Sequence, residues 1–344
     1  MTFRTEIPMR WVDLDAQGHA NNALIPKYCL QAWADFLQAG GQAQLLPKLT
    51  VLKCQVQYLA PISFSQDPIG VVVQTLGVTS FRVRVEFTLT SQNRPVALVR
   101  ATVGFEDQDV ENPQSLPEPA RDWFGQHQPD AKNTVLAKAV APPPKLESVQ
   151  AAKDQLDAGL AAEVDPLASL VAQEPVPDEP AADNAPGESD PFPVFPNWRV
   201  GEGGFVYEFP LRYSDISAHG HIGPITVFDI VAEARNRMHP PDESRTRMEE
   251  AAEEGIIWLV VRQDVEYLAP IEYSFRPLRV RTAFGRVGTT SLTLVAQVED
   301  GGASAPCART VTVLVCADKE GKPIPVPASI TRSAALWPAE VAPI

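Results

Sequence analysis

Between Asn22 and Ala39, apolar side chains recur at the three- and four-residue spacing of an amphipathic helix. They form two adjacent rows: Leu24, Tyr28, Ala32 and Phe36 in one, and Ile25, Cys29, Trp33 and Leu37 in the other. The opposite side is polar and carries Lys27, Gln31, Asp35 and Gln38. Gly40-Gly41 follows as a stop signal. The pattern therefore predicts a helix over residues 22–39, with an apolar stripe wide enough to lie across a sheet.

Segments on both sides of this helix show the two-residue alternation that is typical of strands. In the first part of the chain, the predicted strands cover residues 2–12, 49–58, 69–76, 81–90 and 96–105. Ala60-Pro61 and Gly77 interrupt them, and residues 91–95 form a hairpin signal. One long helix among antiparallel strands predicts an α+β fold in which the sheet wraps around the helix.

The same pattern returns in the second part of the chain. Three pairs of segments match in the same order: Arg10–Leu37 with Arg212–Arg235, Val56–Ile62 with Val265–Ile271, and Thr79–Ser80 with Thr290–Ser291. The first match has an offset of 202 residues, which places Gly18 on Gly220 and His19 on His221. Three ordered matches at nearly constant offset predict a tandem duplication.

The second copy repeats the order of predicted elements. A helix is expected over residues 224–238, and strands are expected at 205–213, 256–267, 278–284, 291–299 and 308–316. Gly223 is the expected helix cap and Pro224 the first helical residue, because proline suits that position. The alignment then makes Asn21 the cap of the first helix and Asn22 its first residue. Pro26 falls just inside that helix, where it either costs a hydrogen bond or shifts the boundary.

Charge and proline content separate the two copies. Residues 107–196 carry 17 acidic and 5 basic side chains and 15 of the 33 prolines, so most of the net charge of −14 lies there. Residues 122–126 still suit the tail of the first unit, residues 146–164 have the apolar spacing of a short helix, and residues 174–196 favour disorder. We expect a first unit at residues 1–126, a linker at 127–196 and a second unit at 197–344.

Composition also excludes several classes of function. The two units are nearly neutral, so no basic face points to a nucleic-acid partner. The four cysteines have no metal-ligand spacing and lie in apolar patterns, which indicates buried thiols in a reducing compartment. No apolar run resembles a signal peptide or a membrane span. We therefore expect a soluble cytoplasmic protein without a membrane partner.

Candidate chemistry lies at the start of the first predicted helix. Residues 13–22 read Asp-x-Asp-x-x-Gly-His-x-Asn-Asn and lead from a strand end into the helix. This motif resembles that of hotdog-fold acyl-CoA thioesterases of the 4-hydroxybenzoyl-CoA thioesterase type. The Tyr-Leu-Ala-Pro-Ile segment and the Thr-Ser turn are also similar to that family. The resemblance covers residues 2–106 and 205–317 and implies a pair of hotdog units in tandem.

The resemblance implies a role for each matching residue. Asp15 would be the catalytic carboxylate, either attacking the thioester carbonyl or activating a water, and the backbone N–H of Asn22 would bind the oxyanion. His19 would assist catalysis. The implied substrate-binding residues are Gly18, Asn21, Tyr58, Thr79 and Ser80. Neither a metal nor an organic cofactor is implied.

The residues alone leave other interpretations open. For Asp13 the sequence favours a structural role, in which its carboxylate pairs with Arg10 or with the strand end. Asp15 either acts in catalysis or caps the turn, and His19 either holds the turn or contacts substrate or water. For Asn21 the sequence favours a role as a helix cap without a catalytic function.

The second copy departs from the motif where the chemistry needs it. Ser217 replaces the second aspartate, and Gly223-Pro224 replaces the asparagine pair. Proline has no backbone N–H, so the implied oxyanion donor is lost. We expect a degenerate partner that completes the acyl pocket of an intramolecular pseudo-dimer, as a monomer or as a further homodimer. Glu233 on the second helix is a minor catalytic candidate.

The predicted function is hydrolysis of an acyl-CoA thioester to free acid and CoA. One alternative is an acyl-carrier-protein thioesterase. Another is a hotdog enoyl-CoA hydratase, although the Asp-x-Asn-Pro-x-His motif of that enzyme is absent. A third alternative is a non-catalytic acyl-CoA-binding protein.

Overall fold

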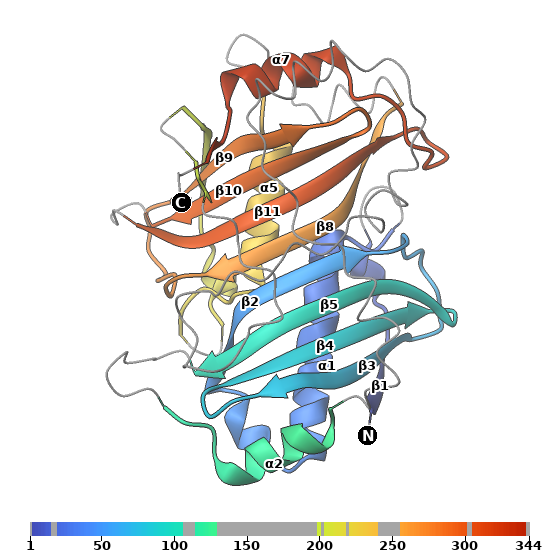
Figure 1. Ribbon diagram of the computed structural model, residues 1–344, viewed down its shortest axis with the longest axis vertical. Helices are drawn as coiled ribbons and strands as arrows, with labels where there is room; N and C mark the ends of the chain where they lie inside the picture. Colours follow the sequence, from blue (N-terminus) through green and yellow to red (C-terminus); the bar gives the residue numbers. More distant parts are fainter. Residues whose placement is uncertain are drawn as a thin grey trace.

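Ten antiparallel strands form one continuous sheet in the order β1-β3-β4-β5-β2-β8-β11-β10-β9-β7 (Figure 1). The computed structural model describes residues 2–14, 19–105, 114–128, 198–200, 203–217, 220–239, 255–300 and 305–341. In the first half, the strands are β1 (Phe3–Ile7), β2 (Leu49–Tyr58), β3 (Ile69–Val78), β4 (Arg82–Ser91) and β5 (Arg94–Phe105). In the second half, they are β7 (Phe205–Phe209), β8 (Ile257–Tyr267), β9 (Leu278–Val287), β10 (Ser291–Glu299) and β11 (Pro306–Ala317). A separate two-stranded sheet pairs β6 (Trp198–Arg199) with β12 (Glu340–Val341).

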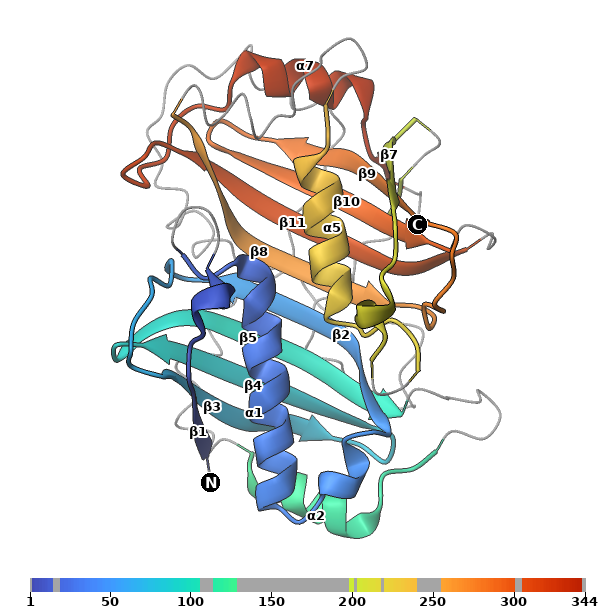
Figure 2. The same ribbon diagram turned by 180° about the vertical axis from the view of Figure 1, so that it is seen from behind.

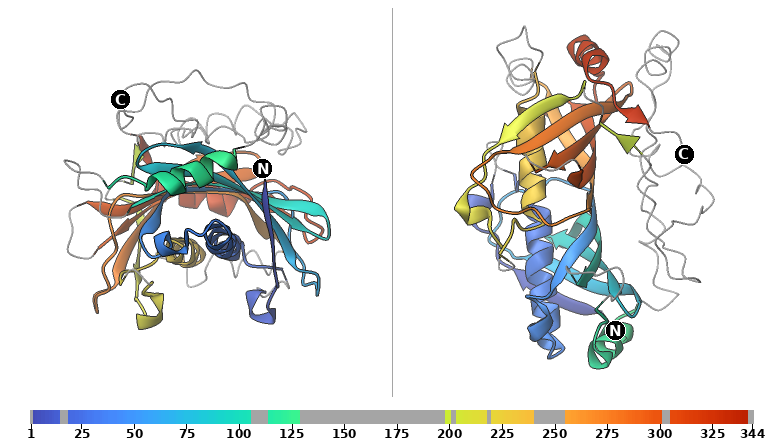
Figure 3. Two further views of the ribbon diagram at one scale, coloured as in Figure 1. Left: turned by 90° about the horizontal axis from the view of Figure 1, so that it is seen from below. Right: turned by 90° about the vertical axis from the view of Figure 1, so that its left-hand side faces the viewer.

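The sheet is curved, and helices α1 (Ile25–Ala39) and α5 (Thr226–Asn236) lie on its concave face (Figures 2 and 3). Helix α1 contacts β1 and β3, and α5 contacts the equivalent strands β7 and β9. A large antiparallel sheet with few helices agrees with the predicted α+β class. Among the described residues, no helix has the length and apolar character needed to cross a membrane.

Helix α1 buries the two apolar rows that predicted it. Tyr28, Ala32 and Phe36 in one row are at most 5% exposed, and Leu37 in the other row is fully buried. The chain enters this helix through a 3₁₀ turn at Asn22–Leu24, and Pro26 lies in the first turn of α1. Proline therefore shifts the start of the α-helix to Ile25. In the first turn the N–H that Pro26 lacks would have no intrahelical acceptor, so no hydrogen bond is lost.

Helix α5 is shorter than expected at both ends. It starts at Thr226 and ends at Asn236, whereas the sequence predicts a helix over residues 224–238. Pro224 lies in the turn before the helix, and its carbonyl accepts a hydrogen bond from the Tyr267 hydroxyl at 2.6 Å. The turn thus replaces the first predicted helical residues.

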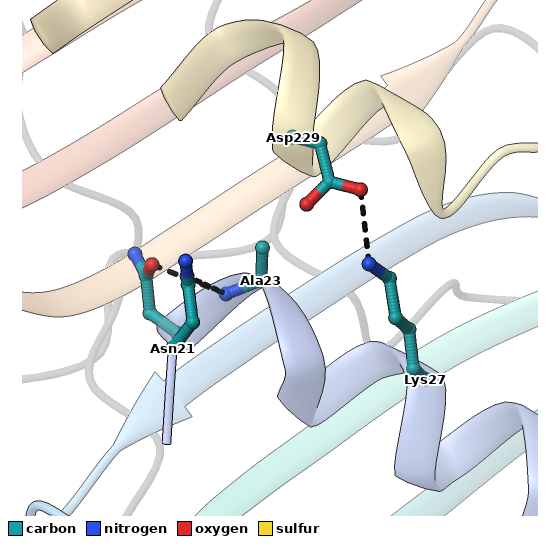
Figure 4. Close-up of polar contacts among 5 residues, drawn as sticks. Asn21, Ala23, Lys27 and Asp229 are labelled. Atoms are coloured by element: carbon teal, nitrogen blue, oxygen red, sulfur yellow. Dashed lines mark hydrogen bonds and ion pairs between the residues drawn. The ribbon is translucent and has the colours of Figure 1, made fainter. Parts of the chain in front are cut away.

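The two halves of the sheet meet at β2 and β8, which pair antiparallel. In this register Gln55 faces Asp264, and these two residues occupy equivalent positions in the repeated segments. Lys27 of α1 and Asp229 of α5 are also equivalent, and their Nζ and Oδ2 atoms lie 3.0 Å apart (Figure 4). Residues that contact their own equivalents lie on a two-fold axis. The axis supports the predicted duplication and the prediction that the two sheets run together.

Two short helices were not predicted. Helix α2 (Glu118–Gln126) packs on β3, and α7 (Ala328–Leu336) packs on β9, so they cover equivalent ends of the sheet (Figure 1). Pro117 and Pro327 precede them as N-caps. Residues 122–126, which the sequence suits to the tail of the first unit, lie in α2 and so pack on β3 of the first half.

Most predicted strands agree with the structure within a few residues, and two do not. The strand expected over residues 2–12 ends at Ile7, and the one expected over 205–213 ends at Phe209. In both cases a 3₁₀ turn follows, in which an arginine N–H donates to an aspartate three residues later: Arg10 to Asp13 and Arg212 to Asp215, each at 2.8 Å. This side-chain bond competes with strand pairing and ends the strand.

Several sequence predictions fall on residues outside the described ranges. They include most of the linker, with its expected helix at 146–164 and the disorder expected at 174–196. Asp15, Gly18 and His219 also lie outside those ranges.

Two ion pairs near the β2–β8 junction should differ strongly in their effect on stability. Arg262 and Asp264 pair at 2.8 Å with side chains 6% and 4% exposed, whereas Lys27 and Asp229 are 45% and 41% exposed. We expect Asp264→Ala to lower the free energy of unfolding by about 3–5 kcal/mol, because it removes the carboxylate that pairs with a buried guanidinium. Asp229→Ala should change it by about 1 kcal/mol or less. Urea denaturation of both variants checks this expectation, and equal losses would contradict it.

Candidate active site

A cavity of about 680 Å³ opens where the start of α1 meets the second half of the chain. This volume is within the range of small-molecule sites. The first half contributes His19, Asn21, Asn22, Ile25, Tyr58 and Val96 to its lining. The second half contributes Arg235 at the end of α5, Met238 just after it, Trp258 of β8, Leu314 of β11 and Ile330 of α7, among others. The cavity therefore joins the predicted site to the other half.

Asparagine side chains shape the start of the first helix (Figure 4). Asn21 Oδ1 accepts a hydrogen bond from Ala23 N at 3.0 Å, and Asn22 Oδ1 accepts one from the same N–H at 3.1 Å. Asn21 thus caps the 3₁₀ turn that leads into α1, whereas the sequence predicts it as the cap of the long helix itself; the residue before α1 is Leu24. The backbone N–H of Asn22 belongs to the first turn, where N–H groups have no intrahelical acceptor and the helix dipole is positive. Such a group is suited to an anionic oxygen.

Tyr58 ties the end of β2 to this helix start. Its hydroxyl donates to the Asn22 carbonyl at 3.0 Å, and burial raises the pKa of the Tyr58 hydroxyl. Tyr267 makes the equivalent bond to Pro224 in the second half. Because the pair recurs in both halves, we assign the Tyr58 hydroxyl a structural bond, while its side chain still lines the cavity.

Asp13 holds the turn before the site. Its Oδ2 accepts from Arg10 N at 2.8 Å and from the buried Tyr28 hydroxyl at 2.9 Å. Burial, with the hydrogen bond to Asp13, raises the pKa of Tyr28. The structural role predicted for Asp13 is confirmed. Asp15 and Gly18 follow outside the described residues, and the chain resumes at His19, which bridges to Ser63 and lines the cavity.

Thr79 and Ser80 do not line this cavity. They form the turn between β3 and β4, where Thr79 Oγ1 accepts from Phe81 N and Arg82 N. Arg82 at the start of β4 pairs with Gly104 of β5, which in turn pairs with Thr50 near the start of β2. Tyr58 is the last residue of the ten-residue strand β2 and so lies at the opposite end. A strand of this length spans roughly 30 Å. The turn therefore cannot reach the cavity.

The equivalent turn of the second half lies at the correct end. Thr290–Ser291 leads into β10, and Leu292 and Leu294 of that strand line the cavity. Under a two-fold axis, the site at the start of one helix takes its remaining walls from the other half. The repeat in the sequence predicts that both halves have such a turn. It does not predict how the two halves are oriented, and so which of the two turns lies near the site.

Arg235 is the main residue that sequence analysis missed. It lies in the last turn of α5 and lines the cavity, and its Nη1 atom is buried without a hydrogen-bond partner in the described part of the chain. Burial lowers the pKa of Arg235 to about 10, so the side chain stays cationic at neutral pH. The offset of 202 places Arg235 opposite Trp33, so the two halves differ here in charge.

The second copy's own motif residues serve its turn. Ser217 Oγ donates to the His221 carbonyl at 2.9 Å, and Gly220 adopts a φ of 88°, which favours glycine. Glu233 forms an i,i+4 ion pair with Arg237 at 2.8 Å on α5 and is not part of the cavity lining. Both residues therefore have local structural partners.

The four cysteines are free and buried. Burial raises the pKa of Cys29, Cys54 and Cys307, which disfavours a reactive thiolate. Within the described ranges, no group of three or more His, Cys, Asp or Glu side chains is arranged to hold a metal ion.

Comparisons with known proteins agree with this geometry. The sequence model described as the thioesterase-like superfamily matches residues 9–124 and 211–334. No curated protein matches the chain in sequence.

Solved thioesterase structures are similar over nearly the whole chain, each at 10% sequence identity. A Lactobacillus plantarum protein provisionally named as an oleoyl thioesterase has a TM-score of 0.59, with 95% of this chain and 98% of that one covered. The 12:0-ACP thioesterase of Umbellularia californica has a TM-score of 0.55, with coverage of 92% and 94%. An acyl-ACP thioesterase of Bacteroides thetaiotaomicron has a TM-score of 0.52, with coverage of 91% and 97%. At this identity the likeness concerns the fold.

Burial should make the four cysteines unreactive in the folded protein. We expect Ellman's reagent to modify native protein at least about a hundredfold more slowly than protein unfolded in urea, because the thiolate is both disfavoured and inaccessible. Absorbance of the released thiolate measures both rates. A native thiol that reacts as fast as in the unfolded chain would contradict this assignment.

Proposed function

We propose that this chain, which belongs to the thioesterase-like superfamily and is a thioester hydrolase, cleaves acyl thioesters at one site where the start of α1 meets the second half. The observation that carries the proposal is the cavity at the N-terminus of α1. A helix start offers backbone N–H groups to a developing negative charge, and the adjoining cavity has room for an acyl group. Its products are a free acid and a thiol.

Asp15 is the catalytic carboxylate of this proposal. It precedes His19, which lines the cavity, and follows Asp13, which fixes the turn. As a general base, Asp15 takes a proton from water while the water oxygen attacks the thioester carbon. As a nucleophile, its oxygen attacks that carbon to form an anhydride that water then hydrolyses. In both routes the C–S bond breaks, and the thiolate leaves and takes up a proton.

Asn22 supplies the oxyanion contact. The carbonyl oxygen gains negative charge as the attacking oxygen bonds, and the N–H of the first helical turn stabilises that charge. Asn21 keeps the turn in place by capping Ala23 N, and His19 contacts the water or the substrate. Gly18 lets the backbone approach the ligand closely.

We further infer that the chain consists of two tandem hotdog units, one catalytic and one degenerate. The two-fold arrangement of strands and the equivalent tyrosine bonds support this division. The first unit occupies residues 1–126 and the second residues 197–344, with an acidic, proline-rich linker between them. Pro224 removes the N–H that an oxyanion contact would need in the second unit.

An acyl-carrier-protein substrate is the second candidate. It is favoured by the two named acyl-ACP thioesterase structures, which cover more than nine-tenths of this chain. Parallel assays with one acyl group carried by CoA and by acyl carrier protein distinguish the two. If the wild-type protein binds acyl-CoA and hydrolyses neither the CoA nor the acyl-carrier-protein thioester, it is instead a binding protein.

Replacing Asp15 with asparagine tests the proposed active site. The change keeps the shape of the side chain and removes its charge, so we expect kcat to fall on the order of a hundredfold or more while the fold is retained. Release of free thiol from an acyl-CoA panel measures the rate, and circular dichroism checks the fold.

Two matched variants in the second half serve as controls. Ser217→Ala and Glu233→Gln should each leave kcat within about twofold of wild type, because these side chains act within their own turn and helix. Full activity in Asp15→Asn, with loss in Glu233→Gln, would reverse the roles of the two halves.

A further inference from the structure

The aromatic cluster under α1 shows how one half of the sheet closes its inner face. Trp33 stacks on Phe124 of α2 with ring centroids 5.6 Å apart, and Phe36 contacts Trp123 at 5.5 Å. Phe36 and Phe124 are fully buried, and Trp33 is 5% exposed. Four large rings therefore fill the space between the end of α1, the sheet and α2 in the first half.

The same positions in the second half carry smaller or more flexible side chains. The helix offset of 202 places Trp33 on Arg235 and Phe36 on Met238. Helices α2 and α7 correspond at an offset of 210, because Pro117 and Pro327 cap them and each helix has 9 residues. This offset pairs Trp123 and Phe124 with two small residues, namely Ser333 and Ala334.

The cavity lies where those side chains fail to fill the second half. Its deep wall is apolar and consists of Met238, Phe284, Leu292, Leu294, Leu314 and Ile330. Among its polar lining residues, Asn21, Asn22 and His19 belong to the start of α1. The cavity thus has an apolar end in the second half and a polar end to which both halves contribute, with Arg235 from the second half. Asn236 and Lys319 of the second half also line the cavity.

We propose that the second half has become the acyl-chain-binding half, which takes the hydrocarbon tail of a fatty acyl thioester whose reacting carbon sits at the start of α1. This inference rests on the proposed function and adds the substrate class. Each methylene that leaves water for the apolar end adds to the binding free energy, so a long chain gains most. Met238, just after α5, and Ile330 of α7 line that end and set how far the chain extends.

Variants that copy the first half into the second test this assignment. Met238→Phe introduces the ring that Phe36 provides in the first half and should shift the preferred substrate toward shorter chains. Ile330→Ala should shift it toward longer ones. Hydrolysis of octanoyl-, dodecanoyl- and palmitoyl-CoA gives the profile, and we expect the ratio of kcat/KM for palmitoyl-CoA to octanoyl-CoA to fall at least about tenfold in Met238→Phe.

Direct binding separates this inference from the proposed function. A fluorescent long-chain fatty acid, measured with wild type and both variants, should bind more weakly to Met238→Phe, and the surface variant Gln38→Ala should bind it as wild type does. Weakened binding without hydrolysis of any thioester would overturn the proposed function and leave this inference standing. Hydrolysis with an unchanged chain-length profile in both variants would overturn this inference alone.

A second observation concerns the cation at the polar end. Arg235 has a buried Nη1 without a hydrogen-bond partner among the described residues, and Tyr58, which interacts with it, is neutral at neutral pH. An uncompensated buried charge is costly, and a ligand anion would offset that cost. We infer that Arg235 binds the carboxylate of the fatty acid product. During the reaction it would bind the polarised carbonyl oxygen of the thioester from which that carboxylate forms. The degenerate half would then supply a substrate-binding residue.

Competition between an acid and the corresponding alcohol tests this role without catalysis. Dodecanoate and dodecanol share a chain and differ in head-group charge, and each can displace the fluorescent fatty acid. We expect wild type to prefer dodecanoate at least about tenfold, which is the range of a charge-assisted hydrogen bond. Arg235→Met should abolish the preference and Arg235→Lys should retain part of it. An unchanged preference in Arg235→Met would overturn the assignment.

Discussion

The hydrogen-bonded edge between β2 and β8 is the constraint on which the rest of the structure depends. It joins two five-stranded halves into one sheet and covers edges that would otherwise be open to other chains. Because the register is centred on Gln55 and Asp264, it also fixes the two helices relative to each other. The start of α1 is thereby carried to the end of α5, and the cavity forms between them.

Elements with a strong period and clear boundaries could be predicted from the sequence. Strands β2 and β10 coincide with their predicted ranges, because alternation and flanking turn residues agree there. Helix α2 was missed because it lies in an acidic, proline-rich region and buries only Ala120 and Phe124. The same weakness hides α7. Short helices of this kind are stabilised by tertiary packing rather than by a pattern of their own.

The candidate site was predictable only where it is local in sequence. The asparagine pair and Asp13 lie in one motif, and their hydrogen bonds join neighbouring residues. Arg235 has no motif, because its relation to the site arises from the axis between the halves. The same axis explains why Thr79–Ser80 lies at the other end of the sheet from the cavity. Side chains that meet only through tertiary symmetry leave no spacing signal in one sequence.

The contacts on the two-fold axis have a consequence for how the two halves recognise each other. In a dimer of identical subunits, every residue on the axis meets its own copy. Two second halves would oppose Asp229 to Asp229 and Asp264 to Asp264, and two first halves would oppose Lys27 to Lys27, with repulsion in each case. Within the fused chain the same positions hold a lysine against an aspartate and a glutamine against an aspartate. The fused chain thus pairs unlike residues at positions where two copies of one half would pair like charges.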